Sequence, residues 1–225
     1  MNTIDWYTYK FHCSSLSNLM VKSRKADEPS ETTKSFLREL WVQETFGRQK
    51  IEMIGNKYTT KGIMCETDSI ELFERVTGKT YFKNNEQLEN EYIVGTPDLK
   101  KPDLVDIKTS WDLFTYAGVD EKKAMKDYYY QLAGYMWLTG EESATLAYCL
   151  VNTPDILAND ELYRLSFKLP DDQTELYRHN YIYDDIPEDM RVKQYHIAPL
   201  DMEGVIESMR EATITARTYL AGLTL

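Results

Sequence analysis

Two short motifs in the middle of the chain have the residue types of a magnesium-dependent phosphate site. Asp98 follows Pro97, and eight residues later Asp106 is separated from Lys108 by one apolar residue, Ile107. The segment around Asp106 has the composition of a strand, which would place Asp106 and Lys108 on one face and Ile107 on the other. If Asp98 ends the preceding strand, two carboxylates and one ammonium meet at a sheet edge. Such a set can bind Mg²⁺ through carboxylate oxygens and place a cation beside a phosphate that is being cleaved.

The chain contains an internal comparison for this motif. Thr153-Pro154-Asp155 repeats the triplet Thr96-Pro97-Asp98, but no acid-x-Lys sequence follows it within reach. We therefore interpret Asp155 as a turn residue. The complete pattern, present only after the first triplet, is that of the PD-(D/E)xK nuclease superfamily.

Length and charge limit the class of protein. A chain of 225 residues suits one domain with a sizeable core. The net charge of −11 argues at first against a nucleic-acid partner, but residues 1–61 carry 10 Lys and Arg against 7 Asp and Glu. An acidic protein can bind DNA when its basic groups line one groove. An acidic protein with an ordinary solvated surface agrees equally well with the charge alone.

The cysteines and the N-terminus indicate the compartment. Cys13, Cys65 and Cys149 are odd in number and lack CxxC spacing, which predicts reduced, buried thiols in a cytosolic protein. The first residues contain neither the basic nor the apolar part of a secretory signal, and no apolar run is long enough to suggest a membrane span. We therefore expect a protein of the cytosol.

Hydrophobic periodicity predicts helices and strands in an α/β order. Between them lie polar segments, of which 170–187 is interpreted as loop and helix at the rim. Helices are expected at 14–21, 32–46, 62–77, 120–138 and 202–220, and strands at 80–82, 91–96, 104–109, 144–151 and 162–169.

This order predicts an α/β (α+β) fold, a small mixed sheet flanked by helices. We expect one nuclease domain over residues 1–225. Within it, residues 1–61 would form a helical part that contacts DNA, 62–152 the catalytic core, and 153–225 a completing strand and helix.

Four segments in order resemble the phage lambda exonuclease group, also called YqaJ-like viral recombinases. The likeness runs from about Phe11 to Ala216 and implies a restriction-endonuclease-like core. It rests on Cys13-Ser14-Ser15-Leu16-Ser17, on Gly62-Ile63-Met64-Cys65-Glu66, on Gly95-Thr96-Pro97-Asp98 with Val105-Asp106-Ile107-Lys108, and on Gln131-Leu132-Ala133-Gly134-Tyr135.

The resemblance implies a role for each central residue. Asp98 would bridge two Mg²⁺ ions, for which Mn²⁺ could substitute. Asp106 would bind one of them, and the Ile107 carbonyl would complete the oxygen shell of that ion. Lys108 would stabilise charge in the transition state rather than act as a base, since a lysine beside carboxylates stays protonated. Glu66 would hold metal-bound water, with the nearby Asp68 as the less favoured choice.

Residues around the centre would contact the substrate. Gln131 would point from its helix into the site and hold water or a phosphate, and Tyr135 lies one turn later on the same face. Thr96 could donate to a phosphate.

Ser14 or Ser15 would receive the 5′-phosphate of a DNA end. The arginine that the family uses there is missing, and Lys10 and His12 occupy its neighbourhood. Lys22, Arg24 and Lys25 could meet the DNA backbone or be solvated.

The expected function is that of a metal-dependent phage recombination exonuclease. The resemblance implies 5′-to-3′ digestion of one strand of linear duplex DNA, a partner that anneals the resulting 3′ overhang, and a homo-oligomer, typically a toroidal trimer. Two alternatives stay open, an endonuclease on the same core and a catalytically silent module that binds DNA ends. A binding module has no need of metal ligands, so the intact acid-acid-Lys set favours an enzyme.

Overall fold

Two small mixed sheets form the centre of the molecule. The computed structural model describes residues 3–23, 25, 28–50 and 55–225, with 171 and 172 as backbone only. In each sheet one pair of strands is parallel and the other antiparallel. The first has the order β1 (Phe11–His12), β3 (Ile93–Gly95), β2 (Leu88–Glu89), and the second β4 (Val105–Thr109), β5 (Ala144–Cys149), β6 (Val192–Ile197).

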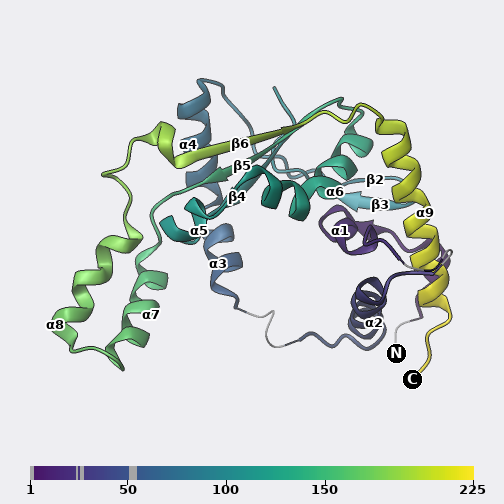
Figure 1. The fold of residues 1–225 in the computed structure, drawn as a ribbon, viewed down its shortest axis with the longest axis horizontal. Coiled ribbons are helices and arrows are strands. Elements are labelled where there is room, and N and C mark those ends of the chain that lie inside the picture. The colour runs from purple at the N-terminus through teal and green to yellow at the C-terminus, as the bar shows by residue number, and fades with distance from the viewer. Residues whose placement is uncertain (1–2, 24, 26–27, 51–54) are drawn as a thin grey trace.

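Helices cover both sheets and extend beyond them on either side (Figure 1). The mixed α/β fold class is therefore confirmed. The helices are α1 (Leu16–Leu19), α2 (Glu31–Phe46), α3 (Lys57–Met64), α4 (Glu66–Thr77), α5 (Leu113–Ala117), α6 (Glu121–Thr139), α7 (Asp155–Ser166), α8 (Asp171–Thr174) and α9 (Met202–Ala221), with 3-10 turns η1 (Trp6–Thr8), η2 (Cys13–Ser15), η4 (Glu175–Tyr181) and η5 (Glu188–Arg191).

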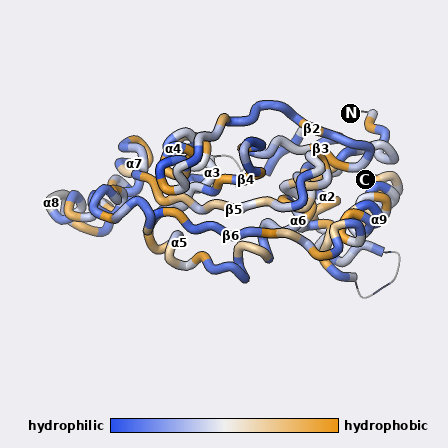
Figure 2. Tube along the Cα trace, turned by 90° about the horizontal axis from the view of Figure 1, so that it is seen from above, coloured by the Kyte–Doolittle hydropathy of each residue, from blue (hydrophilic) through white to orange (hydrophobic). Residues whose placement is uncertain are grey.

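The second sheet separates two hydrophobic clusters. Alternate residues of β5 face opposite sides, so that Leu146 joins the larger cluster around α6 while Ala147 joins a smaller one beneath α4. Helix α6 also contacts β3 and η2, and α9 closes the larger cluster against α1 and α2. The hydropathy trace in Figure 2 shows β5 running through the middle of these layers. Helix α6 thus packs against strands of both sheets and holds them together.

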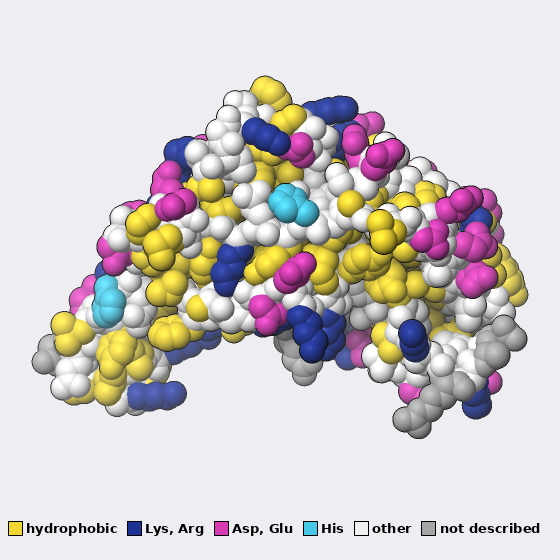
Figure 3. Space-filling view, turned by 45° about the horizontal axis from the view of Figure 1, so that its top comes forward, with side chains coloured by type: hydrophobic (Ala, Val, Ile, Leu, Met, Phe, Trp, Pro, Cys, Tyr) yellow, Lys and Arg dark blue, Asp and Glu magenta, His cyan; other side chains and the backbone are white. Residues whose placement is uncertain are grey.

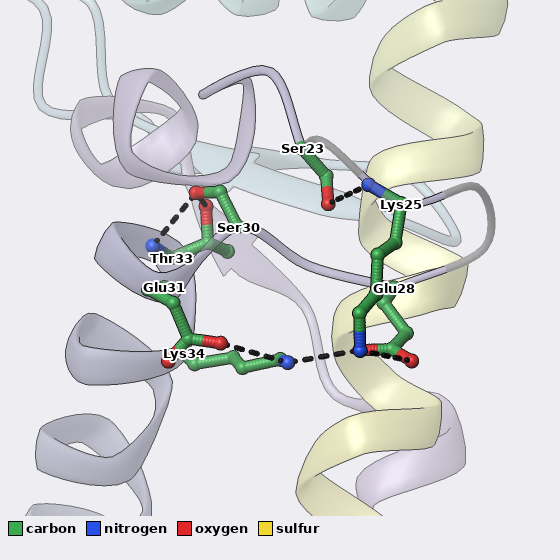
Figure 4. Close-up of polar contacts among 7 residues, drawn as sticks. All are labelled: Ser23, Lys25, Glu28, Ser30, Glu31, Thr33 and Lys34. Atoms are coloured by element: carbon green, nitrogen blue, oxygen red, sulfur yellow. Dashed lines mark hydrogen bonds and ion pairs between the residues drawn. The ribbon is translucent and has the colours of Figure 1, made fainter.

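Side-chain caps set the ends of the main helices. Ser30 Oγ accepts a hydrogen bond from Thr33 N at 3.1 Å and starts α2, and Lys34 pairs with Glu28 and Glu31 within the first turns (Figure 4). Asp120 caps α6 in the same way through Lys123 N. The predicted bounds of these two helices are confirmed to within one residue.

One predicted helix is two helices, and one predicted strand is not formed. The pattern over 62–77 breaks at Cys65, which separates α3 from α4. Residues 80–82 form no strand, and only Lys83 makes an isolated bridge, to Leu99. The break lets α4 start at Glu66 and pack against β4, β5 and β6.

The region after β5 was predicted wrongly. Residues 162–169 were expected to be a strand, but residues up to Ser166 belong to α7. Asp155 is the first residue of that helix rather than a turn residue, because Pro154 precedes it at the N-cap. Strand β6, which was not predicted, completes the sheet instead.

The chain from α7 to η4 forms an arm at one end of the molecule (Figure 1). Hydrophobic side chains gather on this end in Figure 3, and acidic side chains gather at the opposite end, near the start of α9.

Within the described residues no helix is long and apolar enough to cross a membrane. Cys13, Cys65 and Cys149 are free and buried, as predicted.

Candidate active site

A short antiparallel bridge brings the two sequence motifs together. Leu99 and Val105 exchange backbone hydrogen bonds of 3.1 and 3.0 Å, which closes the loop between them. Asp98 therefore lies beside β4, where its Oδ2 accepts a hydrogen bond from Ile107 N at 2.7 Å. The expected convergence of Asp98 with the strand that carries Asp106 is present.

Asp106 and Lys108 point to the same side of β4. Lys108 Nζ lies 2.7 Å from Asp106 Oδ2, and the ammonium is also 4.8 Å from the centre of the Tyr128 ring on α6. Ile107 points to the other side, into the smaller hydrophobic cluster. The alternation of a strand thus puts both charged groups toward α6.

Helix α6 supplies a second layer of contacts. Gln131 Nε2 donates to Asp106 Oδ1 at 2.9 Å and to the Tyr135 hydroxyl at 3.0 Å. Both side chains are buried, at 6% exposure each. Gln131 therefore reaches the site as predicted, whereas a DNA contact by Tyr135 does not fit its position, since its hydroxyl is enclosed behind Gln131.

The carboxylates repel one another in this arrangement. Burial, together with the negative charge of Asp106, raises the pKa of Asp98 to about 7. Burial also lowers the pKa of Lys108, but the carboxylates of Asp106 and Asp98 raise it by more, so Lys108 stays protonated. One ammonium does not balance two carboxylates, and the site favours a further cation.

Glu66 lies at the rim of the same cleft. It begins α4, and its Oε2 accepts a hydrogen bond from Lys83 Nζ at 2.6 Å. The cleft has a volume of about 520 Å³, and Glu66, Asp98, Lys108 and Tyr58 are among the residues that line it. Glu66 thus lines the cleft and is paired with a surface lysine, whereas Asp68, the other candidate, is exposed and does not line the cleft.

The serine turn packs behind the site. A Cβ on Gly95 would lie 2.7 Å from Cys13 Sγ and 2.8 Å from Tyr135 Cε1, so only glycine permits this approach of η2 to β3 and α6. Ser14 is exposed, whereas Ser15 Oγ donates to His12 O at 2.7 Å.

Thr96 is exposed and does not line the cleft. Of the three basic residues named for the DNA backbone, Lys22 and Lys25 line a separate pocket near α9 and Arg24 lies outside the described residues.

The oxygen donors fit a hard divalent cation. Asp106 Oδ2 is buried and accepts no well-oriented hydrogen bond, although Lys108 Nζ is close to it. Among the described residues no three His, Cys, Asp or Glu side chains gather closely enough to hold an ion alone. Mg²⁺ does not need them, because it is commonly held by one or two carboxylates and completed by water and substrate phosphate.

Two residues of this region were not singled out from the sequence. Ser110 follows Lys108 at the strand spacing and lines the cleft. Lys61 is completely buried next to it. The alternation Asp106, Lys108, Ser110 could have indicated the serine, whereas nothing in the sequence marks Lys61 as buried.

Solved structures of exonucleases resemble the whole chain. A phage-related exonuclease from Haemophilus somnus 129PT is 29% identical, with a TM-score of 0.77 over 95% of this chain and 94% of that one. An alkaline exonuclease from Laribacter hongkongensis is 16% identical, with a TM-score of 0.58 over 97% of this chain and 93% of that one. The latter enzyme has also been solved in complex with dAMP. No protein-family model and no curated protein sequence matches the chain.

These likenesses confirm the predicted resemblance to the lambda exonuclease group and the prediction of a nuclease. The first neighbour carries that conclusion, since at 16% identity the second supports the fold alone.

Proposed function

We propose that this chain, which has the fold of the phage-related exonucleases, is a metal-dependent enzyme that digests one strand of linear duplex DNA. The observation that carries the proposal is the cluster of Asp98, Asp106, Lys108 and Gln131, in the order and spacing of the motifs. Asp98 and Lys108 of this cluster line the cleft. A surface ion pair would not need a carboxylate that is buried and also held by an amide from a second element.

Each residue of the cluster has a distinct task in the proposed reaction. Asp98 and Asp106 hold Mg²⁺, with the Ile107 carbonyl as a further oxygen donor; the bound ion supplies charge neutralisation and an acidified water. Gln131 fixes the orientation of Asp106 through its amide. Lys108, already protonated, stabilises the negative charge that grows on the phosphate oxygens.

Glu66 would orient the attacking water from the rim once Lys83 is displaced. Among residues farther from the cluster, exposed Ser14 and Thr96 are better placed than Ser15 to meet a phosphate, because the Ser15 hydroxyl is already bonded.

The finer features of the reaction follow from the resemblance. We propose 5′-to-3′ polarity, a 3′ overhang as product, a homotrimeric ring around the DNA, and transfer of the overhang to a single-strand annealing protein. The dAMP complex of the Laribacter enzyme supports mononucleotides as the released product. Free buried thiols agree with action in the reducing cytosol of a bacterial host.

End-labelled DNA tests the proposed polarity. With Mg²⁺, a duplex labelled at its 5′ ends should release the label as a mononucleotide in the first turnovers, whereas a 3′ label should stay on long strands. Duplexes with 5′-phosphate and 5′-hydroxyl ends, run side by side, show whether a terminal phosphate is bound. Release of the 3′ label first would reverse the polarity, and internal fragments without loss of end label would indicate an endonuclease.

The identity of the metal should separate binding from cleavage. Mg²⁺ and Mn²⁺ should support digestion, whereas Ca²⁺ should allow DNA binding with at most about 1% of the Mg²⁺ rate, because its larger and looser shell positions water poorly. The measurement is nucleotide release with each ion, next to DNA affinity by fluorescence anisotropy. Sustained digestion in excess chelator would rule out the metal mechanism.

A further inference from the structure

Ser110 carries a buried hydroxyl without a partner at the wall of the catalytic cleft. The residue is 4% exposed, and within the described part of the chain its Oγ has no hydrogen-bond partner. Leaving a buried hydroxyl without a hydrogen bond destabilises the folded chain. Since buried polar groups are nearly always bonded, an unbonded one beside a substrate cleft points to a ligand atom.

The strand geometry places this serine in line with the catalytic residues. Ser110 N donates to Cys149 O at 2.9 Å, so the backbone of Ser110 is still held to β5, although β4 ends at Thr109. Asp106, Lys108 and Ser110 therefore occupy alternate positions on one face of the strand. Ser110 lies about 6.6 Å beyond Lys108 along the strand, a step comparable with the separation of neighbouring phosphates on a DNA strand.

A buried cation behind Ser110 makes this wall attractive to an anion. Lys61 is 0% exposed, and its Nζ donates to Trp111 O and Val151 O, both at 2.9 Å. Among the described residues no carboxylate forms an ion pair with it. Burial lowers the pKa of Lys61 to about 8, so most of its charge remains at neutral pH. A buried positive charge without an ion-pair partner among the described residues therefore lies against the Trp111 carbonyl, one residue beyond Ser110.

We propose that Ser110, backed by Lys61, forms a phosphate subsite that binds one linkage of the DNA strand next to the linkage being cut. The subsite rests on the proposed nuclease function. It adds to that function a fixed position of the DNA strand relative to the catalytic residues. Ser110 donates to a non-bridging phosphate oxygen, and Lys61 supplies charge from behind without touching the DNA. The subsite is a device for positioning, because it holds the strand so that the adjacent phosphate faces Asp98, Asp106 and Lys108.

A combination of one enzyme variant and one altered linkage tests the subsite. Ser110→Ala should lower kcat/KM on normal duplex roughly 10- to 100-fold, the effect of losing a hydrogen bond to a charged group. Its melting temperature should stay unchanged or rise, because an unsatisfied hydroxyl is removed. Ser208→Ala is the matched control, since that hydroxyl bonds Gly204 O on α9, far from the cleft, and its activity should equal wild type.

The altered linkage is a single neutral methylphosphonate, placed in turn at the second to fifth linkages from the attacked end. At one position it should slow wild type about as much as Ser110→Ala does, and there it should slow the variant little further. At the other positions wild type and variant should lose rate by the same factor. Equal losses at every position, or an unchanged kcat/KM in Ser110→Ala, would overturn the subsite.

Binding distinguishes a failed subsite from a failed nuclease. The affinities of the same duplexes in Ca²⁺ are measured for wild type and Ser110→Ala, and do not depend on turnover. Coupling at one linkage in binding, with no cleavage by wild type in Mg²⁺, would keep the subsite and contradict the proposed activity. If wild type cleaves DNA, but the variant and the altered linkage act independently in both cleavage and binding, the proposed activity stands and the subsite is wrong.

Discussion

Replacing Asp106 by asparagine should abolish DNA cleavage, by at least about 10³-fold, while the chain stays folded. Asparagine keeps the shape of the side chain, and its amide oxygen can still accept the hydrogen bond from Gln131 Nε2. What is lost is one negative charge from the pair that would hold the cation. Asp98→Asn should have an effect of the same order, because its carboxylate belongs to the same pair and is likewise held within the site by Ile107 N.

The second Thr-Pro-Asp triplet provides the control for both variants. Asp155 stands in the same sequence context as Asp98, but its side chain is 93% exposed on the arm. Asp155→Asn should retain wild-type nucleotide release. Circular dichroism and thermal melting should show all three variants folded. Retention of more than about a tenth of wild-type activity by a folded Asp98 or Asp106 variant would remove that residue from the catalytic centre.

Lys108→Met should lower kcat by about 10²–10³-fold and change DNA affinity little. The ammonium lies against Asp106 and the Tyr128 ring, and its charge is suited to the transition state rather than to the ground state. Methionine keeps most of the apolar stem and removes the charge. Single-turnover rates and anisotropy on the same duplex separate the two quantities.

Lys83→Met is the matched control for that change. Lys83 also pairs with an acidic residue of the cleft, Glu66, but is 47% exposed at the rim. Its loss should change the rate by less than about tenfold in either direction, as expected for an exposed ion pair. If Lys108→Met instead weakens DNA binding in proportion to its loss of rate, the lysine binds substrate and has no special role in the transition state.

The relative placement of the candidate site residues was predictable from the sequence because it depends on strand and helix periodicity. A spacing of two residues puts Asp106 and Lys108 on the same face in any strand, and a helical turn does the same for Gln131 and Tyr135. The spacing could not predict how deeply each side chain is buried. Tyr135 is enclosed because η2 packs against β3 and α6 at Gly95, a contact between segments far apart in the chain.

The region after β5 shows where local pattern fails. Residues 162–169 alternate in polarity like a strand, yet the helix that begins after Pro154 continues to Ser166. A short pattern of polar and apolar residues fits both the helical and the strand period. The helix-start signal at Pro154 determined that a helix forms here. Strand β6 was missed because four of its six residues are neither aliphatic nor fully buried and only Ile197 is buried, so its sequence has no apolar run.

Lys61 and Ser110 illustrate a different limit. A lysine in a helix is ordinarily solvated, and only the folded chain brings its ammonium to the carbonyls of Trp111 and Val151. An unsatisfied hydroxyl likewise exists only after every neighbour is in place. Features of this kind depend on tertiary structure and must be found there.

The most direct test of the central claim compares linear and covalently closed circular duplex of the same sequence, in Mg²⁺, with wild type and Asp106→Asn. We predict that wild type degrades the linear DNA to nucleotides and leaves the closed circle intact, because an exonuclease needs a free end. Asp106→Asn should leave both intact. Rapid cutting of closed circles by wild type, or degradation of linear DNA by Asp106→Asn at the wild-type rate, would contradict an exonuclease built on this site.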